Sequence, residues 1–214
     1  MKLITEPYLE QLNRWPRSGR HILAQFDDSS VIVYQAYRPS IGLHAAKHQK
    51  FGGDFSFTRM SWIKTNFLWM MYRSGWGAKE NQEVVLAIRL RRESFDWILQ
   101  NAVHSTFHPE IYQDGAMWEK AISDSSVRLQ WDPDHDPAGI RSERRAIQLG
   151  LRGEALVMYA RDWIVEIEDI SDFVRDQREY AQAPELYSKL LVPREETYPV
   201  TDPKTRSRIG VSNA

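Results

Sequence analysis

The chain of 214 residues contains no cysteine. Disulfide bonds, thiolate nucleophiles and cysteine-based zinc sites are therefore excluded. No apolar run approaches the roughly 18 residues that a membrane-spanning helix needs. Residues 1–16, MKLITEPYLEQLNRWP, also lack the apolar core of a secretory signal. These absences predict a cytoplasmic protein with no membrane partner.

An excess of charge of one sign is missing as well. Lys and Arg number 28 against 29 Asp and Glu, so the formal net charge is −1. A chain without a basic excess has no global field to attract nucleic acid. Net charge therefore does not support a nucleic-acid partner, and such binding would depend on a local basic patch.

Several nucleotide and hydrolase signatures are absent. The sequence contains no G-x-x-x-x-G-K-[ST] loop, no G-x-G-x-x-G fingerprint and no G-x-S-x-G elbow. The absence of these motifs argues against a P-loop ATPase, a Rossmann dehydrogenase and an α/β-hydrolase. Two H-x-x-x-H pairs, His44/His48 and His104/His108, lack the Glu of the H-E-x-x-H zinc motif, so we expect no metal.

Hydrophobic periodicity predicts a mixed α+β fold. Strands and helices follow one another without strict alternation, which favours a single domain with a mixed or mainly antiparallel sheet and flanking helices. The sheet could be split into two small sheets around a cleft. Strands are predicted at 21–26, 31–37, 83–91, 127–131, 145–151 and 163–168, and helices at about 40–49, 66–74, 93–101, 117–122, 153–162 and 171–182. We expect a loosely attached N-terminal extension over 1–19, a domain over 20–192 and a mobile tail over 193–214.

The segment from Phe55 to Gly77 is the most informative part of the chain. It holds seven aromatic residues, interleaved with Arg59, Lys64 and Arg73. One interpretation is a core helix whose cations reach water. The other is a ligand cleft with an aromatic wall, in which the cations hold phosphate or carboxylate. Tryptophan recurs every seven residues, at positions 62, 69 and 76, which predicts one core-facing element with at least two of the rings mostly buried.

A second basic region follows in the sequence. Arginine forks match phosphate geometry bidentately, although surface cations are usually solvated. In the cleft interpretation, the cations of 55–77 share a cavity with at least one arginine of the second region. The ligand-binding candidates are Gln35, Arg38, Arg59, Trp62, Lys64, Arg73, Arg145 and Gln148, and the second region also supplies Arg141, Arg144 and Arg152.

Two carboxylates are placed together by strand alternation. Glu166 and Glu168 in WIVEIED share one face, because strand side chains alternate with period two. That face is either solvated or the wall of a cleft, and in a cleft the two groups would push their pKa values apart.

Several long segments of the sequence resemble a known family. They are HILAQFDDSSVIVYQAYRPSI, FSFTRMSWIKTNFLWMMYRSGWG, VLAIRLRRESFDWIL, VRLQWDPD and RRAIQLGLRG. They are similar to the bacterial and fungal family known as domain of unknown function 4291, over about His21 to Val174. The family's name implies no activity.

The order of these segments also resembles, more distantly, small ADP-ribosyltransferase-like domains. That resemblance implies NAD as cofactor, bound between two small sheets. It further implies Glu168 of the E-x-E word as the catalytic carboxylate, Ser61 as the middle-strand residue and Gln35 near the first-strand position. Tyr34 or Trp62 would stack on nicotinamide. The resulting hypothesis is an enzyme acting on a nucleotide-type ligand, with a non-catalytic module that binds a nucleotide, RNA or peptide as the alternative.

Overall fold

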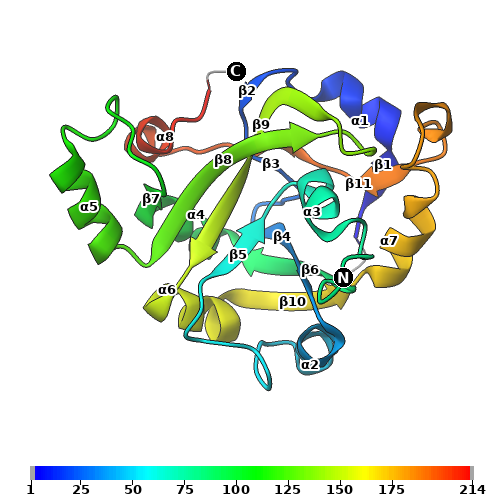
Figure 1. Ribbon diagram of the computed structural model, residues 1–214, viewed down its shortest axis with the longest axis horizontal. Helices are drawn as coiled ribbons and strands as arrows, with labels where there is room; N and C mark the ends of the chain where they lie inside the picture. The colour runs from blue at the N-terminus through cyan, green and yellow to red at the C-terminus, as the bar shows by residue number, and fades with distance from the viewer. Residues whose placement is uncertain (1–2, 213–214) are drawn as a thin grey trace.

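An eight-stranded sheet runs through the centre of the molecule in the computed structural model, which describes residues 3–212 (Figure 1). Its strand order is β10-β6-β4-β5-β9-β8-β7, with β2 pairing alongside β9. The pairs β2–β9 and β7–β8 are parallel and the others are antiparallel. The fold is therefore α+β, as the periodicity predicts. The strands are β2 (Gly19–Arg20), β4 (Ser30–Tyr37), β5 (Ser61–Lys64), β6 (Val84–Arg91), β7 (Ala102–His104), β8 (Val127–His135), β9 (Arg141–Leu151) and β10 (Ile164–Asp169).

Helices flank this sheet, and two short ladders lie outside it. The ladders are β1 (Thr5–Pro7) with β11 (Leu191–Pro193), and β3 (Leu23–Ala24) with β12 (Glu196–Thr197). Within residues 3–212, no helix is both long and apolar enough to cross a bilayer. The helices are α1 (Tyr8–Arg14), α2 (Pro39–His48), α3 (Phe67–Ser74), α4 (Arg92–Asn101), α5 (Gly115–Asp124), α6 (Gly153–Met158), α7 (Ser171–Arg178) and α8 (Pro203–Ile209), with a π-helical turn η1 (Tyr159–Trp163) and a 3₁₀ turn η2 (Pro184–Leu186).

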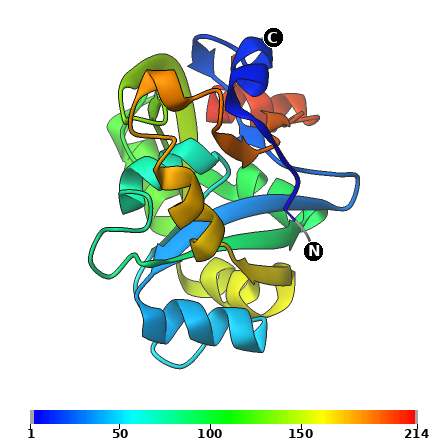
Figure 2. The ribbon, with the colours of Figure 1, turned by 90° about the vertical axis from the view of Figure 1, so that its right-hand side faces the viewer.

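Strand β4 is buried on both faces and separates two hydrophobic cores. Period-two alternation sends Val31 and Val33 into one core, and Ile32 and Tyr34 into the other. The first core also receives side chains of α2, α4 and α6, and the second receives side chains of α3 and α7. Figure 2 shows α2 and α6 on one side of β4 and β6, with α7 on the other. A strand covered on both faces can carry a site only where it ends.

The sheet forks between β4 and β5. These two strands meet at one register pair, Tyr34 with Lys64, whereas β4 pairs with β6 from Ser30 to Tyr37. Beyond the single pair, the end of β4 and the start of β5 diverge. The sheet is continuous, but it opens at this point, and the opening holds the candidate site described below.

Helix α3 begins and ends where its sequence predicts. The Asn66 side-chain oxygen accepts a hydrogen bond from the Trp69 backbone N–H at 2.7 Å, and Gly75 ends the helix with a φ of 58°. The tryptophans do not belong to one element, which corrects that part of the expectation. Trp62 lies on β5 and Trp76 follows α3, both mostly buried, and Trp69 on α3 is buried, so the expected burial of at least two rings is confirmed. The seven-residue spacing crosses a strand, a helix and a turn, so it does not describe one face.

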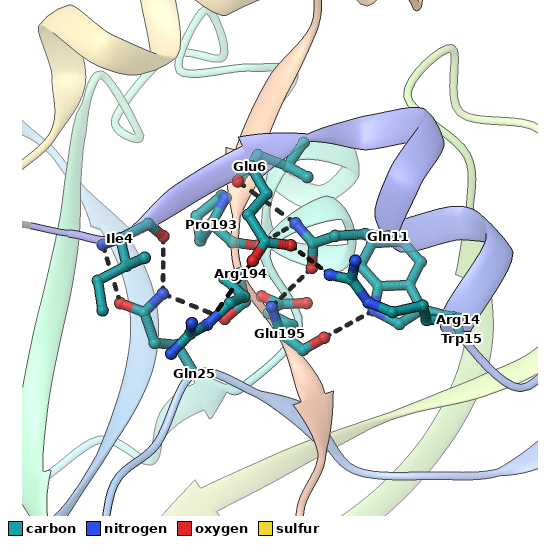
Figure 3. A network of polar contacts seen from close by, with 10 residues as sticks. Ile4, Glu6, Gln11, Arg14, Trp15, Gln25, Pro193, Arg194 and Glu195 are labelled. Atoms are coloured by element: carbon teal, nitrogen blue, oxygen red, sulfur yellow. Dashed lines mark hydrogen bonds and ion pairs between the residues drawn. The ribbon is translucent and has the colours of Figure 1, made fainter.

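The segments at the two ends of the described chain hold each other in place, which corrects the expectation of a loose extension and a mobile tail (Figure 3). Gln11 donates to the Pro193 carbonyl at 2.8 Å and accepts from the Glu195 N–H at 2.7 Å. Trp15 donates its indole N–H to the Glu195 carbonyl at 2.8 Å. Tyr8 and Trp15 are buried in this contact. The short amphipathic pattern around Tyr8 and Trp15 does not indicate that their rings are buried against another part of the chain. We call residues 4–15 with residues 191–195 the terminal clasp.

The last described segment is also packed against the domain. Tyr198 and Ile209 are buried in the first core. Arg208 donates to the carbonyls of Leu99 and Gln100 at the end of α4. Apolar burial and hydrogen bonds together thus pack residues 196–212 against the domain.

Candidate functional site

A cavity of about 960 Å³ lies at the fork. It is bounded by the end of β4, the start of α2, the loop before β5, β5 itself, α3 and the middle of β8 and β9. Eight of the predicted site residues line it, namely Gln35, Arg38, Arg59, Ser61, Trp62, Lys64, Arg73 and Gln148. Ligand sites in proteins are typically concave and of about 300–1,000 Å³. This cavity is the best candidate for a site among the described residues.

Four cations line the cavity and only one carboxylate among the described residues does so. Arg38 forms an ion pair with that carboxylate, Asp54, at 3.2 Å. Arg59 and Arg73 are exposed and make no ion pair with any residue from 3 to 212. Convergent positive charge in a concave site raises the local concentration of anions. The cavity is therefore electrostatically suited to an anionic ligand.

Lys64 is the buried member of this set. Its side chain lines the cavity from the central strand β5, and the residue is 7% exposed. Burial and, to a smaller extent, the charge of Arg73 lower the pKa of its amine to about 8, against the opposing charge of Asp132. No hydrogen bond or ion pair joins this amine to any part of the chain that the structure describes. A cationic side chain that lines a cavity without a partner in the described chain is a candidate for binding an anion, so Lys64 is the first residue to consider as a ligand contact.

Acceptor groups lie behind the cations. Gln148 donates to the Gln130 side-chain oxygen at 2.7 Å and to an Asp132 carboxylate oxygen at 2.5 Å. Burial raises the pKa of Asp132, whereas the hydrogen bond from Gln148 and the positive charge of Lys64 both lower it and only partly offset the effect of burial. Because Gln148 and Lys64 are direct register partners on β9 and β5, these groups form one polar row across the sheet.

A second polar network fixes Ser61 at the mouth of the fork. Tyr159 donates to the Gln35 side-chain oxygen at 2.6 Å, which orients the amide so that its nitrogen donates to the Ser61 hydroxyl at 2.8 Å. The hydroxyls of Tyr37 and Ser61 are 2.7 Å apart. Whichever of the two donates, the other keeps one proton free, so the pair presents a hydroxyl donor to the cavity. Burial raises the pKa of Tyr37, which keeps the phenol protonated.

The expected catalytic trio is not brought together. Ser61 lines the cavity, but Tyr34 and Glu168 do not. Alternation turns the Tyr34 ring into the second core, where it packs edge-on against Phe67 with ring centroids 5.5 Å apart. Glu168 lies on the edge strand β10, separated from β5 by β6 and β4. Its Oε2 atom is buried without a hydrogen-bond partner among the described residues.

The second basic region does not reach the cavity either, which corrects the predicted convergence. Arg144 forms a buried ion pair with Asp134 at 2.5 Å, and its guanidinium lies 5.0 Å from the centre of the Trp15 ring. Arg152 donates to carbonyls around the end of α5, including Ser123 at 2.8 Å. Arg145 is exposed on β9, and neither it nor Arg141 lines the cavity. Arg144 and Arg152 thus have structural partners that the sequence pattern does not reveal.

The two histidine pairs do come together in space. The ring centroids of His44 and His48 are 4.3 Å apart, and those of His104 and His108 are 4.5 Å apart. Burial lowers the pKa of His104 to about 4, and its ring contacts the Arg208 carbonyl at 3.0 Å. Over residues 3–212, no group of three or more His, Asp or Glu side chains is arranged to hold a metal.

Several residues of the site are not among those that the sequence predicts. Tyr37 could have been found, because it shares a strand face with Gln35 in VYQAY. Asp54 and Gln130 line the cavity but carry no motif. Tyr159 comes from the π-helical turn η1, and no signal in the sequence connects it with Gln35.

The comparisons with known proteins agree with the words singled out in the sequence. A family model described as a domain of unknown function (DUF4291) matches residues 21–198. The comparison with curated proteins gives no match. The matched segment contains every residue that lines the cavity. The chain therefore belongs to the DUF4291 family.

Proposed function

We propose that the cavity at the fork binds a nucleotide-type ligand through its phosphate groups. The observation that carries this proposal is Lys64, a cation that is 7% exposed, lines the cavity and forms no ion pair or hydrogen bond with residues 3–212, although the charge of Asp132 acts on it. Natural proteins keep such costly groups chiefly where function needs them. An anion in the cavity would supply the missing partner.

The other lining residues suit the remaining parts of such a ligand. Arg59 and Arg73 can each bind a phosphate oxygen pair bidentately. The half-buried ring of Trp62 can stack on a base or on nicotinamide. Ser61 and Gln148 supply hydrogen-bonding groups for a ribose or a carboxamide. A volume of about 960 Å³ is at the upper end of the range for small-ligand sites, so it accommodates a dinucleotide as well as a mononucleotide.

An NAD-dependent, ADP-ribosyltransferase-like reaction is the second candidate. It is favoured by the opening in the sheet and by the Ser61–Gln35 pair at its mouth. Glu168 is not part of this proposal, because it does not line the cavity. In the non-catalytic alternative, the same cavity binds a nucleotide or an RNA end and no bond is broken.

Calorimetric titration of the whole chain with ADP, NAD and inorganic phosphate tests the binding proposal. We expect Lys64→Met to weaken ADP binding by about tenfold or more, since a charge-assisted contact in a buried site is typically worth ~1.5–3 kcal/mol. Lys79→Met is the matched control, because Lys79 is exposed and does not line the cavity. Equal ADP affinity in both variants, or no binding by the wild type, would contradict the proposal.

A nicotinamide-release assay separates the two candidate functions. Release of nicotinamide from NAD that is lost in Ser61→Ala but retained in Glu168→Gln would support the enzyme. NAD binding without release of nicotinamide would support the non-catalytic binding module instead.

A further inference from the structure

The amine of Lys64 differs from those of the other lysines in the described chain. Between residues 3 and 212, Lys64 alone of the lysines is buried, and the others are exposed. Its neighbours in the cavity are the cations Arg59 and Arg73, with Asp132 behind Gln148 on the β8 side and the phenol of Tyr34 on β4 as its register partner. None of these groups forms an ion pair or hydrogen bond with the amine. The surroundings therefore give Lys64 a larger fraction of neutral amine, the nucleophilic form, than an exposed lysine has at the same pH.

Resting on the proposed phosphate site, we infer that Lys64 is a nucleophile that forms an imine with a phosphate-bearing carbonyl ligand. The geometry provides both requirements. The amine opens into the cavity from the rigid central strand β5, and two arginines that can hold a phosphate line the same cavity. The ligand class is an aldehyde or ketone that carries phosphate, such as the ring-opened aldehyde of a ribose phosphate.

The step balances without an oxidant or a reductant. The lone pair of the Lys64 nitrogen attacks the carbonyl carbon, and a carbon–nitrogen bond forms. The nitrogen gives up its two protons, the carbonyl oxygen takes up two and leaves as water, and a carbon–nitrogen double bond replaces the carbon–oxygen double bond. Any hydroxyl that donates a proton to the oxygen regains one from the nitrogen. The Ser61–Tyr37 pair holds a hydroxyl proton at the same cavity and can donate it to the carbonyl oxygen.

The lowered pKa of Lys64 supports this chemistry. At a pKa of about 8, roughly half of the amine is neutral at pH 8. A free lysine side chain, with a pKa near 10.4, is neutral there in well under about 1% of molecules. Nucleophilic lysines are activated in this way, by burial or by a neighbouring cation.

Reductive trapping on the wild-type chain tests the inference. Pyridoxal 5′-phosphate is the probe, pyridoxal without phosphate is its matched control, and cyanoborohydride reduces any imine to a stable amine. Peptide mass spectrometry then maps the modified lysine. We expect the phosphorylated probe to modify Lys64 about tenfold faster than Lys79 or Lys47, with a pH midpoint of about 8. We also expect it to act at Lys64 about tenfold faster than pyridoxal does, and ADP to protect Lys64.

Mapping on the wild type does not depend on how a variant folds, and Lys64→Arg adds a second measurement. This variant should lose the adduct at position 64, because a guanidinium group does not form an imine with the probe. Modification spread over exposed lysines, or equal rates with and without phosphate on the probe, would overturn the inference. If ADP binds by calorimetry but Lys64 is not modified, the inference that Lys64 is a nucleophile is refuted, whereas the proposed phosphate-binding site is still supported. If ADP does not bind at all, the proposed function fails as well.

Discussion

Replacing Lys64 with methionine should stabilise the protein at neutral pH. Methionine keeps the length and the unbranched stem of lysine, so packing around β5 changes little. The charge is what disappears. Burial and Arg73 lower the pKa of the amine from 10.5 to about 8. At ~1.36 kcal/mol for each pKa unit, this corresponds to about 3 kcal/mol of folding free energy that the charged amine costs.

The pH dependence fixes the sign of this effect. Below about pH 8 the amine is protonated in both the folded and the unfolded chain, and the folded state carries the full cost. Between about pH 8 and 10.5 the unfolded chain holds the proton and the folded chain does not, so the wild type gains stability as pH rises. The advantage of Lys64→Met should therefore be largest at pH 7 and shrink towards pH 10.

Urea unfolding in a buffer without phosphate measures this difference, with Lys79→Met as the control for removing an exposed lysine. The control should change the free energy of unfolding by no more than about 0.5 kcal/mol, as is usual for surface substitutions. A Lys64→Met variant that is no more stable than the wild type at pH 7, with a difference independent of pH, would refute the reasoning. It would mean that the amine is solvated or paired in solution.

Three further predictions concern the framework around the site. Arg144→Met should cost about 3–5 kcal/mol in urea unfolding, because it strands a buried carboxylate; a loss below about 1 kcal/mol would show that the ion pair is dispensable. Burial raises the pKa of Glu195, so the folded protein keeps this proton to higher pH than the unfolded chain does, and the wild type loses stability as pH rises. Between pH 5 and pH 8 the melting temperature should therefore fall less in Glu195→Gln than in the wild type. The exposed control Glu196→Gln should behave like the wild type. Identical slopes in all three would contradict this. Gly42→Ala would place a Cβ 2.5 Å from the Val84 Cβ, so it should cost about 1–3 kcal/mol in thermal unfolding, and Val84→Ala should recover part of the loss. A cost unchanged by the second substitution would locate the clash elsewhere.

Local signals predicted most of the elements of this fold. Alternation identified β6 over Val84–Arg91, and the Asn66 cap with Gly75 identified α3. The hairpin of β8 and β9 is longer than predicted: the strands expected at 127–131 and 145–151 extend over Val127–His135 and Arg141–Leu151, and the segment DPDHDP lies partly within β8. Asp and Pro favour turns in isolated sequence, but pairing with a neighbouring strand overrides that preference here.

The candidate site could be predicted only where its residues lie close in sequence. Arg59, Ser61, Trp62 and Lys64 fall within one short stretch, and all of them line the cavity. The partners of Arg144 and the place of Glu168 depend on strand order, which composition and periodicity do not determine. The E-x-E spacing placed two carboxylates on one strand, but it carried no information on how far that strand lies from β5.

The terminal clasp bears on how the chain is made. Trp15 donates to a carbonyl 180 residues further along the chain. At the ~5–20 residues per second of protein synthesis, that partner emerges roughly 10–35 s after Trp15 does. During this interval the rings of Tyr8 and Trp15 have no site in which to be buried, and the peptide groups of β1 have no strand to pair with. The contacts that bury these rings and pair β1 can therefore form only after residues 191–195 have been synthesised.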